Sequence, residues 1–577
     1  MGAFAIIRRD KRRRREDTID RVRASFAAQG FAEPKLLETE FAVVLLYPKL
    51  VTGQINLVAD TTGDFAFYTG SLVHRRKTGD AALGDLLKHS PERFTTGTDL
   101  TGVYALVVNN GRGLRLMLDP LGAYKVYTDP EKIVWSSSFL AAVATVEAPQ
   151  IDAQGVYEYV FNGATYGKAT VIRQISMIEP GLHKIGRVAT FQPNHLPAIT
   201  TPLDDPQDML IDKNLALLRE KIGAVAKAFG PDIDMALTGG YDSRLMLALF
   251  RDAGITPRLH VYGSADDPDV AIAKLIAAGE NPSLSHVNKE QGSSNLPPEE
   301  LAQVVREQFL SFDGCPPDGV FGNGQDLATR RARCESGRLA LNGGCGEIYR
   351  NFFYLPDRPF TTREMAWSFW SRFDPAACHR DFSECSYLDR MEEKMRAALA
   401  TNAQLLTRPQ VEYLYPAFRG RFWTSLNTCV NLRFGDASTP FVDLSLARAA
   451  ALVPVKYKSY GMFEAALIRA IDPRLAAYPS AYGHDFATPP SRAHRLSEWS
   501  SMMRPPLLRR LTFRLRNRMS KQPPPWYLTP ASTKVLLPNG LHYMSSLFNP
   551  ARIHDEGQLN RIFTLEYLFQ SVNARAS

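Results

Sequence analysis

Six consecutive residues near the middle of the chain, 238–243, combine groups that bind phosphate. Their sequence is Thr-Gly-Gly-Tyr-Asp-Ser, so the hydroxyls of Thr238 and Ser243 lie on both sides of a glycine pair. Glycine tolerates positive φ and has no Cβ, which lets several backbone N–H groups converge on a ligand. Asp242 could hold the magnesium ion that accompanies a nucleotide. The combination predicts an anion-binding turn, whereas a bare glycine pair would indicate only a turn between a strand and a helix.

A strand and a helix must position this turn. Residues 233–237 are Ile-Asp-Met-Ala-Leu, a short buried-strand pattern, and an apolar helical pattern begins near Asp242. Free N–H groups and the positive end of the helix dipole at such a start favour an anion. Apolar spacing over residues 207–229 predicts a helix that leads into the strand.

Two further strands are predicted to end in loops near the same place. Residues 258–263 predict a strand followed by a helix over 270–278, and residues 338–341 predict a strand that runs into the loop 342–347. Strands that alternate with helices form a parallel sheet, and ligands bind at the carboxyl ends of its strands. The three loops are therefore expected to meet at one edge of a sheet.

Several acidic residues directly before helices are assigned to capping. Asp266, Asp267 and Asp269 precede the helix over 270–278, and Asp443 precedes another helical pattern. Carboxylates at such positions usually accept hydrogen bonds from the free N–H groups of the first turn. We predict helix caps here rather than ligands.

The stretch 238–243 resembles the pyrophosphate-loop motif of the ATP pyrophosphatases, Ser-Gly-Gly-x-Asp-Ser, with Thr238 in place of the first serine. These enzymes activate a carboxylate or amide oxygen by forming an adenylate. The resemblance implies ATP and Mg²⁺ as cofactors and a parallel-sheet domain of the adenine nucleotide α-hydrolase type. The implied nucleotide-binding residues are Leu237, Thr238, Gly239, Gly240, Asp242, Ser243, Val261, Gly263 and Gly343.

The N-terminal third resembles the glutamine-amidotransferase domain of asparagine synthetases. Gly102–Leu106, Asp119–Tyr127 and Trp135–Ser137 take the places of that domain's phrases G-x-F-A-L, D-x-x-G-x-x-P-L-Y and F-A-S. The resemblance implies an Ntn-hydrolase-like fold of two stacked antiparallel sheets flanked by helices. A working member needs a nucleophilic cysteine directly after the initiator methionine. Gly2 stands there and the first cysteine is Cys315, so we expect a degenerate domain without glutaminase activity.

The loop 342–347 resembles the asparagine synthetase motif S-G-E-G-x-D-E. Glu347 stands where the family has its second magnesium ligand, so Asp242 and Glu347 are the implied metal ligands and catalytic carboxylates. Gly344 stands where the family has a substrate-facing glutamate. That glutamate is therefore missing from this chain.

The family also has a lysine that balances charge on the adenylated intermediate. The corresponding segment here, 475–485, contains no lysine. His484 is the candidate replacement within the segment, and Lys456 or Lys458 are alternatives that the sequence leaves open.

The length of the chain suggests more than one domain. Its positive charge is concentrated in two clusters. The polar, proline-bearing segment 193–206 predicts a boundary between a degenerate amidotransferase-like domain, 1–205, and an amide-ligase domain, 206–577. The net charge is +8, and the excess is concentrated in residues 8–15 and 504–521. Nucleic acid or an acidic membrane surface would explain such clusters, but a solvated surface is the commoner explanation. We expect no nucleic-acid partner.

Cysteine usage and apolar runs indicate a cytoplasmic setting. The six cysteines show no C-x-x-C spacing, and so few in 577 residues do not form a disulfide framework or a zinc site. Ala3–Ile7 is too short an apolar run for a signal peptide. The sequence contains no run of about 18 apolar residues, so we predict no membrane span.

These resemblances imply an ATP-dependent, AMP-forming carbon–nitrogen ligase. In lacking the glutaminase cysteine, the chain resembles lasso peptide macrolactam cyclases and β-lactam synthetases. These enzymes join an amine and a carboxylate within one substrate. We favour the peptide cyclase, acting on a precursor peptide beside its protease in antibiotic peptide biosynthesis, because a basic cleft suits a longer substrate. The alternatives are a β-lactam-synthetase-like or intermolecular amide ligase, and a non-catalytic protein that binds nucleotide or peptide.

Overall fold

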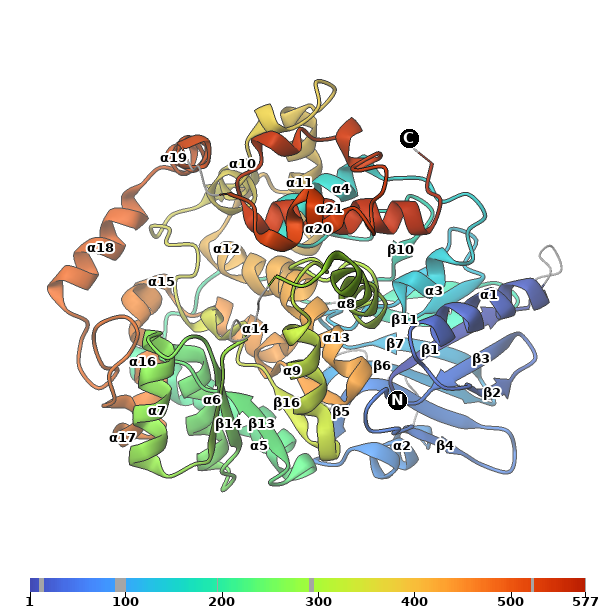
Figure 1. The fold of residues 1–577 in the computed structure, drawn as a ribbon. Helices are drawn as coiled ribbons and strands as arrows, with labels where there is room; N and C mark the ends of the chain where they lie inside the picture. Colours follow the sequence, from blue (N-terminus) through green and yellow to red (C-terminus); the bar gives the residue numbers. More distant parts are fainter. Residues whose placement is uncertain (10–14, 89–99, 195, 290–294, 520–522, 576–577) are drawn as a thin grey trace.

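The computed structural model describes residues 1–9, 15–88, 100–194, 196–289, 295–519 and 523–575. Residues 10–14 and 520–521 of the two basic clusters lie outside this set. The described chain folds into two antiparallel sheets, a five-stranded parallel sheet, a two-stranded sheet and many helices (Figure 1). The expected mixture of antiparallel sheets and a parallel sheet with helical additions is confirmed.

Residues up to 193 form two six-stranded antiparallel sheets. The first has the strand order β10 (Ser176–Met177), β8 (Tyr127–Thr128), β9 (Val134–Ser136), β1 (Ala3–Arg8), β3 (Ala42–Tyr47) and β2 (Lys35–Glu38). The second has the order β12 (Thr190–Pro193), β11 (Gly181–Ile185), β7 (Gly113–Leu118), β6 (Leu100–Asn110), β5 (Phe65–His74) and β4 (Leu57–Ala59). The predicted hairpin is present, because β6 and β7 pair up to Asn110 and Gly113.

The two sheets stack face to face. Alternate residues of β1 point to opposite sides, so Phe4 contacts Phe67 of the second sheet with ring centroids 5.7 Å apart, while Ala5 faces helices. Helices α1 (Arg15–Ala28) and α3 (Phe139–Val143) cover the outer face of the first sheet, and α2 (Gly79–Leu87) covers that of the second. The arrangement is four layers, helix, sheet, sheet and helix.

The second half of the chain is built on the parallel sheet. Its strand order is β15 (Leu284–Val287), β14 (Arg258–Tyr262), β13 (Ile233–Ala236), β16 (Leu339–Leu341) and β19 (Asp436–Ser438). The chain builds outward from β13 through β14 to β15 and then returns to place β16 on the other side of β13. The strand order reverses between β13 and β16, which is where ligands bind in open α/β sheets.

Helices connect and surround these strands, much as the apolar spacing predicted. The connecting and packed helices are α5 (Gln207–Phe229), α6 (Tyr241–Asp252), α7 (Pro268–Glu280), α8 (Pro298–Ser311), α9 (Gln325–Cys334), α14 (Leu444–Ala451) and α16 (Met462–Ile471). Outside them lie α4 (Ala153–Asn162), α10 (Thr362–Met365), α11 (Glu384–Ala398), α12 (Arg408–Leu414), α13 (Ser425–Phe434), α15 (Val455–Lys458), α17 (Pro473–Ala476), α18 (Arg492–Met503), α19 (Pro506–Met519), α20 (Pro530–Thr533) and α21 (Glu556–Ser571). The α16 helix packs on α6, the helix that follows the predicted anion-binding turn.

The two halves share one hydrophobic core. Buried residues of both stacked sheets and of the parallel sheet belong to a single cluster, and α21 packs against α4 of the N-terminal half. The side chains of Lys49 and Asp436 form an ion pair across the halves. The described residues between β12 and α5, where we predicted a domain boundary, form no helix or strand.

Most of the described part of the C-terminal basic cluster lies in helix α19. Helices α18 and α19 lie at one edge of the molecule (Figure 1). None of the helices that the structure describes combines the length and apolar character needed to cross a membrane. The six cysteines are all free thiols.

Candidate active site

The predicted anion-binding turn lies between β13 and α6, at the carboxyl edge of the sheet. The Ser243 hydroxyl accepts a hydrogen bond from the Thr238 backbone N–H at 3.1 Å, and the two side-chain hydroxyls are 3.0 Å apart. The Gly240 N–H donates to the Thr238 hydroxyl at 3.2 Å. The two hydroxyls are therefore brought together on the turn as the sequence suggested.

Close approach, and not positive φ, explains the glycine at position 239 of the turn. Neither Gly239 nor Gly240 has positive φ, so that part of the prediction is wrong. A Cβ on Gly239 would lie 2.9 Å from the Ile272 side chain and 3.0 Å from the backbone nitrogen of Ala481. The Ala481 N–H donates to the Gly239 carbonyl at 3.1 Å, which locks the turn against the segment that contains residues 475–485.

One of the acidic residues assigned to capping has a different role. Asp267 caps α7 as predicted, because its carboxylate accepts from the Asp269 N–H at 2.9 Å. Asp269, however, accepts a hydrogen bond from the Gly239 N–H at 2.8 Å and thereby ties the loop after β14 to the turn after β13. Of the other two predictions of this kind, that for Asp443 is confirmed, because it caps α14. Asp266 is exposed and is not the N-cap residue of α7.

The loop after β16 lies directly against the start of α6. A Cβ on Gly346 would be 2.8 Å from the Asp242 Cβ, and one on Gly343 would be 3.4 Å from the Ser243 backbone nitrogen. This close contact brings Glu347, in the short helix Gly346–Tyr349, into electrostatic contact with Asp242. The Tyr415 hydroxyl donates to the Glu347 carboxylate at 2.8 Å and fixes its direction.

A buried arginine that sequence reasoning missed lies at the centre of this cluster. Arg350 donates to Asp242 at 2.7 Å and forms an ion pair of 2.8 Å with Glu464 on α16. The Glu464 side chain is completely buried. Two signals were available in the sequence: Arg350 follows Glu347 by three residues, and Glu464 is a lone carboxylate in an apolar helix.

The cluster holds more negative than positive charge. Asp242, Glu347 and Glu464 are three carboxylates that meet the single guanidinium of Arg350. Burial raises the pKa of Asp242 to about 7, Arg350 opposes this shift and Glu347 adds to it. Burial and the neighbouring Asp242 raise the pKa of Glu464 well above its usual range. The site therefore favours an added cation or protons.

A polar pocket opens beside the cluster, with a volume of about 180 Å³. Glu347 and Arg350 line it together with four tyrosines and Glu498. The tyrosines are Tyr241, Tyr354, Tyr460 and Tyr482. The Arg350 guanidinium donates to the Tyr482 hydroxyl at 3.3 Å, so the segment 475–485 supplies part of the wall.

His484 lies behind this wall. Its Nε2 is 3.0 Å from the Tyr241 hydroxyl, and its ring is 4.6 Å from that of His494. Burial and His494 lower the pKa of His484. It is not among the residues that line the pocket and reaches the cluster through Tyr241.

The two lysine alternatives differ in their surroundings. Lys458 is buried and donates to Glu412 at 2.6 Å, beside the Arg408–Glu412 pair. Lys456 stacks on the ring of Tyr457 with its Nζ 4.9 Å from the centroid. Neither is among the residues that line the pocket.

Three of the predicted nucleotide-binding residues, Leu237, Val261 and Gly263, could contact a nucleotide only through their backbone atoms. Leu237 and Val261 have side chains in the core, with 0% and 1% exposure. Gly263 has a φ of +139°, and a Cβ there would lie 3.0 Å from the Asp267 carboxylate. Within the described part of the chain, no group of three or more His, Cys, Asp or Glu residues is arranged to hold a metal ion by itself.

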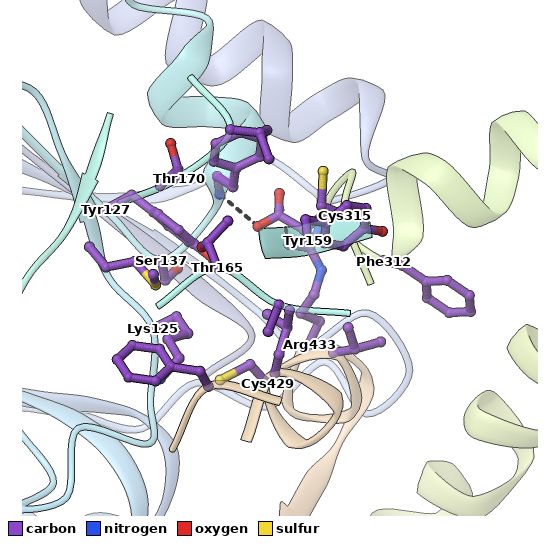
Figure 2. Close-up of a pocket in the computed structure, with 18 residues that line it drawn as sticks. Lys125, Tyr127, Ser137, Tyr159, Thr165, Thr170, Phe312, Cys315, Cys429 and Arg433 are labelled. Atoms are coloured by element: carbon purple, nitrogen blue, oxygen red, sulfur yellow. Dashed lines mark hydrogen bonds and ion pairs between the residues drawn. The ribbon is translucent and has the colours of Figure 1, made fainter. Parts of the chain in front are cut away.

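Figure 2 shows a second cavity, of about 60 Å³, between the N-terminal sheets and α13. The Lys125 ammonium lines it and donates to the carbonyls of Gly122 and Arg421 at 2.8 and 2.6 Å, and burial lowers its pKa to about 7. Burial raises the pKa of the Cys429 thiol to about 11, so this cysteine is not a thiolate at neutral pH. None of the predicted site residues lines this cavity.

Comparisons with known proteins leave the site to be interpreted from its residues. No protein-family model matches this chain, and no curated protein matches its sequence. The interpretation therefore depends on the turn after β13, the loop after β16 and the pocket beside them.

Proposed function

We propose that the chain is an ATP-dependent, AMP-forming amide-bond synthetase of the asparagine synthetase-like type. The observation that carries this proposal is the convergence of two loops at the point where the strand order reverses. The turn 238–243 follows β13 and the loop 342–347 follows β16, and they meet through Gly346 and Asp242. This supports a nucleotide at the carboxyl edge of an ATP-pyrophosphatase-like sheet, with its phosphates at the start of α6.

The charge of the cluster supports a magnesium ion. Asp242 and Glu347 are the carboxylates that would hold it, and the excess of three carboxylates over one guanidinium is what a divalent cation would relieve. When bound, the ion supplies neutralisation of the phosphate charge. Its remaining ligands would be phosphate oxygens and water, which fits the lack of a self-sufficient metal site among the described residues.

In this proposal the residues of the site bind the reacting groups and exclude water from them. The hydroxyls of Thr238 and Ser243 are proposed to donate to the departing pyrophosphate, and the tyrosine-lined pocket is proposed to hold the acceptor. In the proposed reaction a substrate carboxylate attacks the α-phosphorus of ATP and pyrophosphate leaves. An amine then attacks the acyl adenylate and AMP leaves. Positioning and exclusion of water by the pocket would contribute several kcal/mol each.

The N-terminal half supports a ligase that does not use glutamine. Its four layers fit a degenerate Ntn-hydrolase-like domain. A Cβ on Gly2 would lie 2.7 Å from the Pro48 carbonyl and 2.9 Å from the Lys49 Cα, so a cysteine at this position has no room. The second substrate is therefore an amine other than ammonia from glutamine. An intramolecular amine, as in a peptide macrolactam cyclase, is the preferred source, and a β-lactam-type or intermolecular ligase is the alternative.

ATP–pyrophosphate exchange tests the proposal without knowledge of the amine. Peptides with Asp or Glu side chains are added with ATP and Mg²⁺, and exchange of labelled pyrophosphate reports adenylation. Asp242→Ala should reduce exchange at least 100-fold, because it removes a carboxylate from the cluster. Asp208→Ala, in the exposed first turn of α5, is the matched control and should stay within twofold.

A non-catalytic nucleotide- or peptide-binding protein is the second candidate. The ion pair between Arg350 and Asp242 favours it, because an occupied carboxylate is a poorer metal ligand. Binding of Mg²⁺–ATP without exchange for any carboxylate would select this candidate. If Asp242→Ala changes neither ATP binding nor exchange, both candidate functions are contradicted.

A further inference from the structure

Five arginines surround a cavity next to the candidate active site. This arginine pocket lies between α18, α19 and the π-helical segment Ala366–Trp370, and its volume is about 360 Å³. Its arginines are Arg372, Arg504, Arg509, Arg510 and Arg516. No aspartate or glutamate is among the described residues that line it.

Most of this positive charge has no carboxylate partner. Within the described chain, Arg510 forms an ion pair, with Glu384 at 2.5 Å, whereas Arg372, Arg504 and Arg516 form none. Arg509 donates to backbone carbonyls, including that of Ser501 at 2.7 Å. Burial, and then the neighbouring charges of Arg504 and Arg372, lower the pKa of Arg509 to about 10. A cavity with several unpaired guanidinium groups attracts anions.

The pocket also contains an unused donor. The indole Nε1 of Trp367 is buried and has no hydrogen-bond partner among the described residues, and Trp367 lines the cavity. An indole N–H can only donate, and a buried donor without a partner destabilises the folded state.

The arginine pocket adjoins the pocket of the candidate active site. Tyr354 lines both cavities. Arg509 donates to the carbonyls of Phe353, at 2.7 Å, and of Tyr354, so the segment between the two cavities is attached to α19. The two pockets are therefore adjacent, and a chain-like ligand that occupied both would pass Tyr354.

We propose that the arginine pocket binds an acidic segment of a peptide substrate, whose reacting groups lie in the tyrosine-lined pocket. Guanidinium groups match carboxylates through paired N–H donors, and several separate arginines suit several side chains along one peptide. The identification of this peptide as the substrate rests on the proposed function. The turn 238–243, and not the arginine pocket, holds the nucleotide phosphates in that proposal.

Fluorescence anisotropy with fluorescein-labelled hexaglutamate tests this binding without ATP. We expect saturable binding at low salt and none with labelled hexaglutamine. The double variant R372Q/R504Q should weaken binding at least tenfold, because it removes two unpaired guanidinium groups. The matched control R380Q/R492Q removes two exposed arginines outside the pocket and should change the Kd less than twofold.

A charge-preserving variant separates loss of recognition from loss of folding. R372K/R504K keeps the charge without the planar fork, and its Kd should lie between those of the wild type and R372Q/R504Q. Thermal melts of all variants test whether the pocket variants are folded. Equal hexaglutamate affinity in R372Q/R504Q and wild type would overturn the proposal.

A phosphate ligand is the other outcome of this test. If tripolyphosphate binds in the pocket and hexaglutamate does not displace it, the acidic-peptide proposal is wrong. The result does not depend on catalysis. Hexaglutamate binding without ATP–pyrophosphate exchange would contradict the proposed function alone, and exchange without hexaglutamate binding would contradict the pocket assignment alone.

Discussion

At the scale of single residues, Arg350 supplies the positive charge that pairs with the carboxylates of the candidate site. Its guanidinium contacts both Asp242 and Glu464, and all three side chains are at most 17% exposed. A buried charge that loses its partner is costly, whereas an exposed ion pair contributes little. The stability of the site therefore depends on this residue more than on any surface ion pair.

Replacing Arg350 with methionine should destabilise the protein by about 3–5 kcal/mol at pH 8, because two buried carboxylates lose their partner. Urea unfolding measures the change. Arg358→Met is the control, since it breaks the exposed Arg358–Glu364 pair and should cost about 1 kcal/mol or less. Equal losses in the two variants would show that the cluster is hydrated and not buried.

The Asp242 carboxyl predicts a pH dependence of stability. Its pKa is raised from 3.8 to about 7 in the folded protein, so the folded state binds a proton that the unfolded state has lost between these values. The stabilising contribution is complete below about pH 4 and is lost as the pH rises to about 7, a change on the order of 4 kcal/mol. Asp242→Asn should flatten this slope in urea titrations from pH 4 to 8. An unchanged slope would place the titration on another group.

At the scale of elements, glycines let two loops approach within contact distance. The sequence identified both loops, but the reason for their glycines is visible only in the packing. Gly239 faces Ala481, and Gly346 faces Asp242. The short connection after β16 would not bring Glu347 beside Asp242 if Gly346 carried a side chain.

Gly346→Ala should destabilise the protein by about 1–3 kcal/mol, because the new Cβ would lie 2.8 Å from the Asp242 Cβ and force the loops apart. It should also weaken Mg²⁺–ATP binding, measured by calorimetry. Gly223→Ala in α5 is the matched control, since no atom lies within 4 Å of its Cβ position, and a helical alanine should stabilise by up to about 1 kcal/mol. A Gly346→Ala protein as stable as the control would refute the close contact.

At the scale of the whole molecule, the two halves behave as one folded body. Their core is continuous, and the ion pair of Lys49 with Asp436 joins the loop after β3 to the edge strand β19. Backbone bonds add to this contact, because the Leu50 N–H donates to the Arg433 carbonyl at 2.9 Å. The N-terminal half therefore supports the parallel sheet.

Lys49→Met should reduce the stability of the entire chain by about 3–5 kcal/mol, because it leaves the Asp436 carboxylate buried without its partner. Circular dichroism and intrinsic fluorescence should report the same shifted urea transition. Lys77→Met, which breaks an exposed pair with Asp85, is the control and should cost no more than about 1 kcal/mol. Separate transitions in Lys49→Met would mean that the halves unfold independently.

The sequence determined the elements and the main loops of the candidate site. Apolar periodicity placed the helix over 207–229 and the strands before Thr238 and Asn342, because burial patterns are local properties of the chain. It also placed Asp267 and Asp443 as caps. The catalytic and nucleotide assignments stay predictions that rest on motif resemblance.

The tertiary structure decided which distant groups meet. Arg350 and Glu464 are 114 positions apart and Asp269 is 30 positions from Gly239, yet each pair is in contact. The order of strands in the sheet and the packing of α16 on α6 create these contacts, and neither leaves a local pattern in the sequence. The charge of the site, the room at Gly2 and the arginine pocket beside Tyr354 all follow from such non-local packing, which is why the sequence alone did not predict them.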